Sequence, residues 1–183
     1  MISLILGGVR SGKSRYAVEQ AKKSKKKTAF IATCVFFDKE MRNRIRLHQL
    51  SRPKHWKLIE EGQDITSALR KIENSYGTAV VDCLGLWISN LLSDNLKDNE
   101  IERKIEKLIQ AILKAKLDVL LVSNDVGSGI MPINALARRF CDLLGLTNQK
   151  IARKADNVIL MSAGIPQILK GDYPNAKIER DIK

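Results

Sequence analysis

A glycine-rich segment that directly follows a short apolar run constrains this chain more than any other feature. The apolar run is Ile2–Leu6, and residues 7–14 read GGVRSGKS, a full match to the pattern G-x-x-x-x-G-K-[ST]. Ser14–Lys23 then contains mostly helix-forming residues. In such a loop, successive backbone N–H groups turn inward around phosphate groups, and the following helix adds the positive end of its dipole. The segment therefore predicts a strand, a phosphate-binding loop and a helix, in that order.

Each position of this loop has a predicted role in binding a nucleotide. The backbone N–H groups that would face the phosphates come from Gly7, Gly8, Val9, Arg10, Ser11 and Gly12. Lys13 is expected to reach the β- and γ-phosphates, and the Ser14 hydroxyl is expected to ligate Mg²⁺. The alternative interpretation is a glycine turn followed by a solvated lysine.

The rest of the chain alternates short apolar runs with longer amphipathic segments, which favours an α/β fold with a mainly parallel sheet flanked by helices. Further strands are predicted at Thr28–Ala32, Lys57–Glu60, Thr78–Val81, Asp118–Ser123 and Asn157–Ser162. Further helices are predicted at Asp38–Ser51, Ile65–Asn74, Leu84–Leu92, Asn99–Lys116 and Ile133–Ala155, the last with Gly145 as a point where it could break. Because the chain shows neither an internal repeat nor a linker, a single domain over residues 1–183 is predicted.

An aspartate ends one of the predicted strands, in the run AVVD at residues 79–82. Ligands of open α/β sheets bind outside the carboxyl ends of the strands, and a carboxylate there can hold the Mg²⁺ of a bound nucleotide through water. Ser14 and Asp82 are therefore the predicted metal-binding residues. The alternative role for Asp82 is to cap the helix predicted from Leu84.

The formal net charge of +12 is unevenly distributed along the chain. Residues 1–60 hold 15 Lys/Arg against 4 Asp/Glu, whereas residues 61–183 hold 17 against 16. Such a basic segment is typical of a nucleic-acid or membrane surface, or of a pocket for polyanionic small molecules such as nucleotides. Aromatic residues make up only 5% of the chain, and no base-stacking platform is identifiable. A nucleotide pocket is therefore preferred, with no nucleic-acid partner.

The chain shows no sign of secretion or membrane insertion. No stretch approaches the ~18 apolar residues of a membrane span, and no secretory leader is recognisable at the N-terminus. The three cysteines, Cys34, Cys83 and Cys141, have no metal-finger or C-x-x-C spacing. They are interpreted as reduced thiols, and the protein is predicted to be cytoplasmic.

One of the two histidines, His48, lies in a setting that permits two interpretations. On a helix over residues 38–51, Met41, Ile45 and His48 share one face, which is typical of a packing histidine. Arg44 and Arg52 stand four residues on either side of His48. Two fixed cations favour a neutral imidazole and attract phosphate, and a neutral histidine can attack an electrophilic phosphorus atom. Spacing alone leaves both interpretations open.

An acidic pair, Glu60 and Glu61, ends a short predicted strand within the basic part of the chain. A carboxylate can accept two hydrogen bonds from the N–H groups of guanine. Solvated surface charge is the simpler alternative.

Several segments along almost the whole chain resemble one enzyme family. They read GGVRSGKSRYA, IATC, DKEMRNRIRLHQLSRPKHW, VVDCLGLWISNLL and VSNDVGSGIMPINALARRFCDLLGLTNQKIA, and the last similarity is at Ala163-Gly164. The patterns R-I-x-x-H and V-G-x-G-I-x-P are more specific than the glycine-rich loop. The family is the bifunctional adenosylcobinamide kinase / adenosylcobinamide-phosphate guanylyltransferase of cobalamin biosynthesis.

The resemblance implies two successive reactions at one site. ATP or GTP phosphorylates the aminopropanol hydroxyl of adenosylcobinamide. GTP then gives GMP to a histidine of the enzyme, and adenosylcobinamide phosphate takes the GMP to form adenosylcobinamide-GDP. The histidine of R-I-x-x-H is His48 here, and Lys13 assists catalysis. The resemblance also implies a RecA-like P-loop fold and a homotrimer.

The resemblance further implies which residues contact the nucleotide. They are Gly7 to Ser14, Ala32, Thr33, Cys34, Gln49, Leu50, Ser51, Arg52, Glu60 and Asp82. The chain departs from the family at Asp125, where a glutamate is usual. Two alternatives stay open: a P-loop small-molecule kinase without guanylyl transfer, and a RecA-like ATPase that depends on nucleic acid.

Overall fold

A seven-stranded sheet forms the centre of the molecule in the computed structural model, which describes residues 1–34 and 53–171. The strands are β1 (Ile2–Gly7), β2 (Thr28–Ala32), β3 (Lys57–Glu60), β4 (Thr78–Asp82), β5 (Asp118–Asn124), β6 (Asn157–Ser162) and β7 (Ile165–Lys170). Their order across the sheet is β3-β2-β4-β5-β1-β6-β7. All neighbouring pairs are parallel except β6 and β7.

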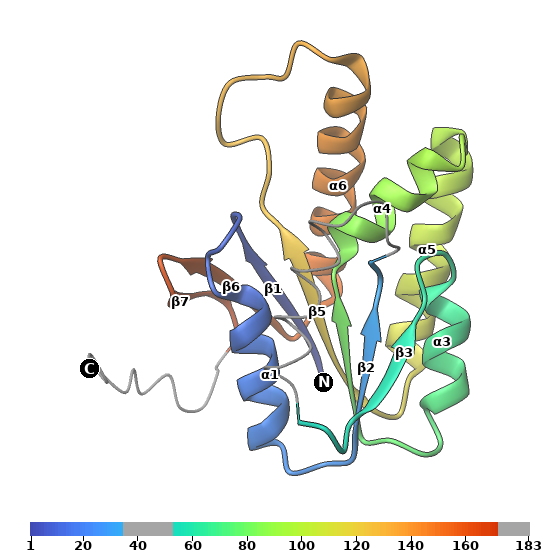
Figure 1. The fold of residues 1–183 in the computed structure, drawn as a ribbon, viewed down its shortest axis with the longest axis vertical. Coiled ribbons are helices and arrows are strands. Elements are labelled where there is room, and N and C mark those ends of the chain that lie inside the picture. The colour runs from blue at the N-terminus through green and yellow to red at the C-terminus, as the bar shows by residue number, and fades with distance from the viewer. Residues whose placement is uncertain (35–52, 172–183) are drawn as a thin grey trace.

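Helices cover both faces of this sheet (Figure 1). They are α1 (Lys13–Lys23), α3 (Ile65–Ile72), α4 (Leu84–Ser93), α5 (Asp98–Lys114) and α6 (Ala135–Lys154). In the described part of the chain, α1 packs on one face, and α3 to α6 pack on the other. The fold prediction, an α/β domain with a mostly parallel sheet flanked by helices, is confirmed.

Two hydrophobic clusters hold the layers together because successive residues of a strand point to opposite faces. On β4, Val80 belongs to the cluster under α1, and Val81 belongs to the larger cluster under α3 to α6. Trp87 of α4 is 1% exposed and is among the largest side chains in the larger cluster. The continuous apolar runs seen in the sequence are thus explained by strands that are buried on both faces.

The predicted strands are confirmed, and the structure differs from the prediction at several helix ends, within α6 and at one further strand. Helix α6 continues through Gly145, because buried neighbours such as Leu143 and Leu144 outweigh the ~1 kcal/mol that glycine costs within a helix. Helix α3 ends at Ile72, two residues before the predicted end. Strand β7 was not predicted at all. The predicted helix Asp38–Ser51 lies outside the described residues.

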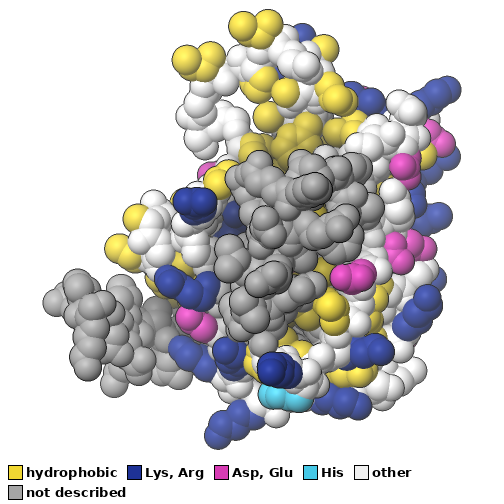
Figure 2. Space-filling model, in the orientation of Figure 1, with side chains coloured by type: hydrophobic (Ala, Val, Ile, Leu, Met, Phe, Trp, Pro, Cys, Tyr) yellow, Lys and Arg dark blue, Asp and Glu magenta, His cyan; other side chains and the backbone are white. Residues whose placement is uncertain are grey.

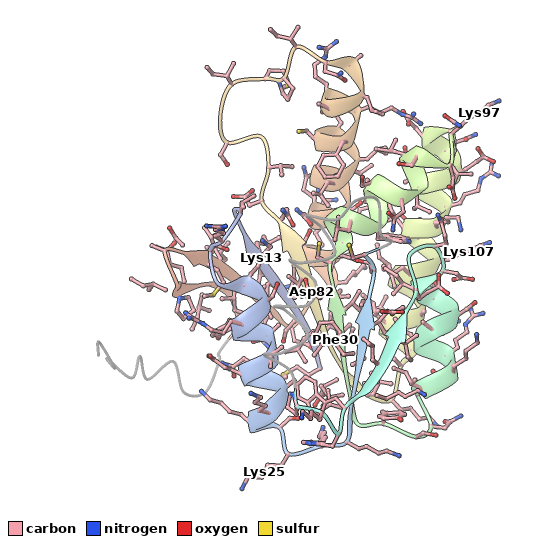
Figure 3. The ribbon with its side chains drawn as sticks, in the orientation of Figure 1. Lys13, Lys25, Phe30, Asp82, Lys97 and Lys107 are labelled. Carbon is pink, nitrogen blue, oxygen red and sulfur yellow. The ribbon has the colours of Figure 1, made fainter. Side chains whose placement is uncertain are left out.

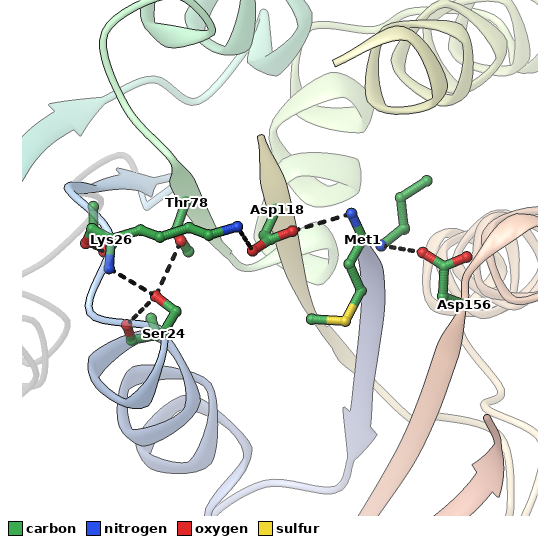
Figure 4. Close-up of polar contacts among 9 residues, drawn as sticks. Met1, Ser24, Lys26, Thr78, Asp118 and Asp156 are labelled. Carbon is green, nitrogen blue, oxygen red and sulfur yellow. Dashed lines mark hydrogen bonds and ion pairs between the residues drawn. The ribbon is translucent and has the colours of Figure 1, made fainter. Parts of the chain in front are cut away.

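A polar cluster joins three elements at the amino edge of the sheet (Figure 4). The Lys26 ammonium lies 2.7 Å from Asp118 Oδ2, and the amino group of Met1 lies 3.1 Å from Oδ1 of the same carboxylate. The Ser24 hydroxyl shares a hydrogen bond of 3.2 Å with Thr78. Burial alone would raise the pKa of Asp118, but the hydrogen bonds and charges of Lys26 and the amino group lower it. The start of β5 is therefore tied to the end of α1.

The lysine run at residues 22–27 belongs to this amino edge. Lys25 lies at the opposite end of the sheet from Lys13 and Asp82 (Figure 3), and the Lys27 ammonium stands 4.6 Å from the centre of the Tyr76 ring. Much of the positive charge in the first third of the chain is therefore remote from the phosphate-binding loop. In the described part of the chain, no helix has the length and apolar character needed to cross a membrane.

Candidate functional site

The glycine-rich segment forms the predicted loop between β1 and α1. Gly12 has φ of 92°, a left-handed conformation that glycine adopts without strain, and it occupies the N-cap position of α1. Within the described residues, no side chain caps this helix. The N–H groups of its first turn therefore remain available to an anion, and the helix dipole adds to their attraction.

Close packing explains why the loop begins with glycine. A Cβ at Gly7 would lie 2.4 Å from Ser11 Oγ and 2.6 Å from the carbonyl oxygen of Met161. By contrast, a Cβ at Gly8 would meet nothing within 4 Å. The loop thus folds tightly at Gly7 and faces open space at Gly8.

The Ser11 side chain is a polar group without a protein partner in the described structure. Ser11 is 7% exposed, and its hydroxyl has no hydrogen-bond partner among the described residues. An unsatisfied buried hydroxyl is uncommon and costs free energy unless a ligand or water completes it. Its place in the loop makes a phosphate oxygen the natural partner.

Neighbouring segments hold the backbone of the loop from two sides. The Gly164 N–H donates to the carbonyl of Ser11 at 3.0 Å, and the Asp125 N–H donates to the carbonyl of Gly7 at 3.1 Å. The first contact comes from the turn between β6 and β7, and the second from the end of β5. The loop is therefore preformed, as a phosphate cradle requires.

The catalytic lysine predicted from the sequence lies over this loop. The Lys13 ammonium donates to the carbonyl of Gly8 at 3.1 Å. The side chain of Lys13 is therefore held against the loop that it follows. Its contact with the β- and γ-phosphates of a nucleotide stays a prediction. Lys13 and Asp82 both lie at the carboxyl ends of the strands (Figure 3).

The two predicted metal-binding residues are brought together, although 68 residues separate them in the chain. The Ser14 hydroxyl donates to Asp82 Oδ1 at 3.3 Å. A hydroxyl and a carboxylate are the hard oxygen ligands that Mg²⁺ accepts, with water and nucleotide phosphates as its other ligands. Within the described residues, no group of three or more His, Cys, Asp or Glu gathers to hold a metal. The arrangement fits a magnesium ion that arrives with a nucleotide.

Strand register places two more predicted contact residues, Ala32 and Glu60, along the same edge as Asp82. Ala32 of β2 pairs with Glu60 of β3 on one side and with Asp82 of β4 on the other. Glu60 is exposed, so its carboxylate is accessible to a ligand. Glu61 differs, because its carboxylate accepts hydrogen bonds from the backbone N–H groups of Gln63 and Asp64. Of the acidic pair, Glu60 is the candidate ligand residue.

The next two positions after β2 have different environments. The buried Thr33 hydroxyl donates to the carbonyl of Cys83 and accepts from its N–H, both at 2.7 Å. Thr33 thus links the ends of β2 and β4, and its side chain positions the edge near Asp82. Burial, followed by the charge of Asp82, raises the pKa of the Cys34 thiol. This thiol therefore stays protonated beside the predicted metal site.

Two asparagines that were not identified from the sequence help to build the site. Asn90 of α4 is 2% exposed, and its amide donates to the carbonyls of Thr33 at 2.8 Å and Gly62 at 3.0 Å. Asn148 of α6 donates to the carbonyl of Asn124 at 3.0 Å, at the end of β5. A buried asparagine in an apolar helix is a signal of such a role, but its partners cannot be read from the sequence.

Comparison with known proteins identifies the family. A sequence model described as cobinamide kinase / cobinamide phosphate guanyltransferase matches residues 3–169. This match spans the phosphate-binding loop, Asp82 and the strands of the central sheet. The chain belongs to this family. The resemblance seen in the sequence motifs is therefore confirmed.

Curated members of the cobinamide kinase / cobinamide phosphate guanyltransferase family are similar over nearly their whole length. The bifunctional adenosylcobalamin biosynthesis protein CobP of Pseudomonas aeruginosa is 39% identical, over 94% of this chain and 99% of that protein. The bifunctional adenosylcobalamin biosynthesis protein CobU of Escherichia coli is 35% identical, over 90% of this chain and 97% of that protein. The corresponding protein of Salmonella typhimurium is 34% identical with the same coverage.

A solved structure supports the fold alone. The KaiC-like protein PH0186 of Pyrococcus horikoshii superimposes with a TM-score of 0.51, over 87% of this chain and 69% of that protein. Its sequence identity is 14%. The two proteins thus share the predicted architecture, a mostly parallel sheet flanked by helices.

The remaining predicted site residues lie outside the described part of the chain. They are His48, Gln49, Leu50, Ser51 and Arg52, together with the neighbouring Arg44. In a member of the cobinamide kinase / cobinamide phosphate guanyltransferase family, this segment carries the R-I-x-x-H pattern. The catalytic role of His48 and the nucleotide contacts of the residues that follow it remain predictions.

Proposed function

We propose that this protein phosphorylates adenosylcobinamide and then transfers GMP from GTP to the product, giving adenosylcobinamide-GDP and pyrophosphate. The observation that carries the proposal is the preformed phosphate loop, with the Ser14–Asp82 pair beside it, in a chain that belongs to the cobinamide kinase / cobinamide phosphate guanyltransferase family. The curated relatives are named bifunctional, which favours two reactions over one. The proposal assigns both reactions to one domain over residues 1–183.

In the kinase step, the chain positions the triphosphate and stabilises its charge. The loop amides from Gly7 to Ser14 surround the phosphates, the Ser11 hydroxyl gains its missing partner, and Lys13 neutralises developing charge on the transferred group. Ser14 and Asp82 would hold Mg²⁺, which draws charge from the phosphate oxygens when bound. The hydroxyl oxygen of the cobinamide then attacks the γ-phosphorus and loses its proton to water. The bond between this phosphorus and the oxygen that bridges to the β-phosphate breaks, and the nucleoside diphosphate leaves.

In the guanylyl-transfer step, His48 acts as the nucleophile. A nitrogen of its neutral imidazole attacks the α-phosphorus of GTP, a P–N bond forms, the bond to the bridging oxygen breaks and pyrophosphate leaves toward the phosphate loop. A phosphate oxygen of adenosylcobinamide phosphate then attacks the same phosphorus, and the P–N bond breaks to restore the imidazole. The covalent intermediate allows one site to serve two acceptors in turn.

The guanosine part of the nucleotide is assigned to the edge beyond the phosphates. Ala32, Thr33 and Cys34 would contact it through backbone and thiol groups, and Glu60 would accept hydrogen bonds from the guanine N–H groups. The segment Gln49 to Arg52 completes this contact in the proposal. We further assign the protein to the cytoplasm and to a homotrimer, on the family resemblance.

Labelling with α-³²P-GTP tests the proposal. The wild-type protein is expected to retain label that is stable to base and lost in acid, as a phosphoramidate requires, and His48→Ala is expected to retain none. His55→Ala is the matched control, because His55 is the other histidine of the chain and is exposed. Label that persists in His48→Ala would refute the assignment of the nucleophile.

Kinase activity separates the bifunctional enzyme from a kinase without guanylyl transfer. Lys13→Ala is expected to weaken phosphorylation of adenosylcobinamide and labelling by GTP alike, since both steps place phosphates in the same loop. If the wild-type protein phosphorylates adenosylcobinamide but never takes up label from GTP, the protein is a kinase alone. Unchanged activity of Lys13→Ala in either step would remove the loop from that step.

A further inference from the structure

Exposed apolar side chains gather on the segment between β5 and α6, which we call the arm (Asp125–Asn134). Ile130 and Ile133 are each 98% exposed and Met131 is 62% exposed, and Leu136 in the first turn of α6 adds a fourth side chain at 57%. Figure 2 shows hydrophobic side chains at the top of the molecule, over the segment that Figure 1 draws between β5 and α6. A soluble protein rarely exposes large apolar groups together unless they bind something.

The arm begins directly beside the phosphate-binding loop. Strand β5 pairs with β1 so that Asn124 lies opposite Gly7, and the Asp125 N–H donates to the carbonyl of Gly7 at 3.1 Å. The chain then extends above the sheet (Figure 1). A chain segment spans at most about 3.6 Å per residue, so Ile130 lies within about 18 Å of Asp125. A large ligand could therefore rest on the arm and still reach the phosphates.

Polar contacts hold the end of the arm that leads into α6. The Arg138 guanidinium donates to the carbonyls of Pro132 and Ile133. The Asn134 carboxamide oxygen accepts from the N–H groups of Leu136 at 2.8 Å and Ala137 at 3.1 Å, which caps α6. The backbone at Pro132 and Ile133 is thus held before a ligand binds, which lowers the entropy that binding at this end of the arm would cost.

The arm is also poor in charge within a basic protein. Asp125 is the sole charged residue from position 125 to position 137, although the chain holds 32 Lys and Arg. Such a surface suits a ligand that is broad, largely apolar and weakly cationic, with the carboxylate at its base as the complementary charge. It does not suit the anionic nucleotide.

We propose that the arm is the platform on which the corrin ring of adenosylcobinamide rests. This inference rests on the proposed function and assigns a site to its second substrate. An alkylcobalt(III) corrin with amide side chains carries one net positive charge and presents apolar ring faces with hydrogen-bonding groups at the rim. Ile130, Met131 and Ile133 contact a face of the ring, and the aminopropanol hydroxyl reaches the γ-phosphate held at the phosphate loop.

The size of the apolar surface favours this occupant over a second copy of the chain. A stable protein–protein interface buries about 800 Å² on each partner, over roughly 20–30 residues. The arm offers four large side chains. A ligand pocket, in contrast, needs only a few apolar groups and a small number of polar ones close to the reacting atoms.

Binding of adenosylcobinamide to the double variant Ile130→Ser/Ile133→Ser tests the platform. Equilibrium dialysis, followed by the visible absorbance of the corrin, measures affinity without catalysis. Removing from water a side chain as large as isoleucine is worth roughly tenfold to a hundredfold in affinity, so the dissociation constant is expected to rise at least about tenfold. Leu113→Ser is the matched control, because Leu113 is an exposed apolar residue of α5, at 44%.

Two further measurements make the result decisive. Labelling by α-³²P-GTP, which needs no corrinoid, reports whether the nucleotide site of the double variant is intact, and light scattering reports its mass. An unchanged affinity for adenosylcobinamide would overturn the platform. A lower mass for the double variant would assign the arm to a second copy of the chain and would also overturn it. If the wild-type protein takes up no label, the guanylyl-transfer step of the proposed function fails, and dialysis still decides the platform.

Discussion

Replacing Asn90 with leucine removes the amide that joins two segments of the nucleotide edge. Leucine is close to asparagine in size, so the change tests the hydrogen bonds more than the packing. The wild-type amide donates to the carbonyls of Thr33 and Gly62, and its own oxygen has no hydrogen-bond partner among the described residues. The helix itself tolerates leucine well.

The expected loss in the free energy of unfolding follows from the two carbonyl groups that Asn90→Leu leaves without a donor. Each buried carbonyl that loses its donor costs about 1–3 kcal/mol, which gives about 2–6 kcal/mol for the two. Removing the unpaired amide oxygen returns roughly 1–3 kcal/mol of the cost of burying it. The free energy of unfolding of Asn90→Leu is therefore expected to fall by about 2 kcal/mol.

Urea denaturation measures this difference, with an unchanged m-value as the sign that the unfolded state is unaffected. Asn99→Leu is the matched control, because it makes the same substitution at an exposed position of α5. Affinity for GTP should fall as well, since the backbone carbonyl of Thr33 would lose the hydrogen bond that Asn90 donates to it. Equal stability of Asn90→Leu and the wild type would show that the two carbonyls find other partners, and would refute the role given to Asn90.

Two further predictions concern the loop and the amino edge. Gly7→Ala is expected to reduce GTP affinity at least about tenfold, and more than Gly8→Ala does, because the new Cβ at position 7 would lie 2.6 Å from the carbonyl oxygen of Met161. Titration calorimetry with GTP measures the affinity of both variants. Equal losses of affinity would contradict the packing argument. Asp118→Asn is expected to lower stability by about 1 kcal/mol at pH 7, through loss of the Lys26 ion pair. Since the pKa of Asp118 is lowered on folding, this contribution is present above the unfolded pKa of about 3.9 and is lost as the pH falls through the folded value. Denaturation of both proteins from pH 7 to pH 3 should show the two curves converging, and a constant difference would be the contrary result.

The parts of the fold that the sequence predicted are those set by local patterns. The run of apolar residues that ends at Asp82 predicted both the strand and the edge at which the carboxylate lies. The motif at Gly7 to Ser14 predicted the position of the loop, because this motif lies between a strand and a helix. Parallel strands then bring Ser14 and Asp82 together without further information.

The parts that were missed depend on tertiary contacts. Strand β7 has no alternating pattern and contains Pro166, and it exists because β6 offers a partner. Thr33, Asn90 and Asn148 act through carbonyl groups that are distant in sequence, so their partners could not be inferred. The exposure of Ile130 could not be predicted from the sequence either, because an apolar residue in a glycine-containing loop can be buried or exposed.

The hydrogen bond from the Gly164 N–H to the Ser11 carbonyl connects the phosphate-binding loop to a turn at the surface of the molecule. The turn at Ala163 and Gly164 is formed by residues that are exposed or half-buried, yet its backbone supports Ser11 of the phosphate-binding loop. We therefore expect a shift of the loop on nucleotide binding to be transmitted to the turn through the carbonyl of Ser11. A reporter group attached at this turn is consequently expected to sense nucleotide binding from outside the site.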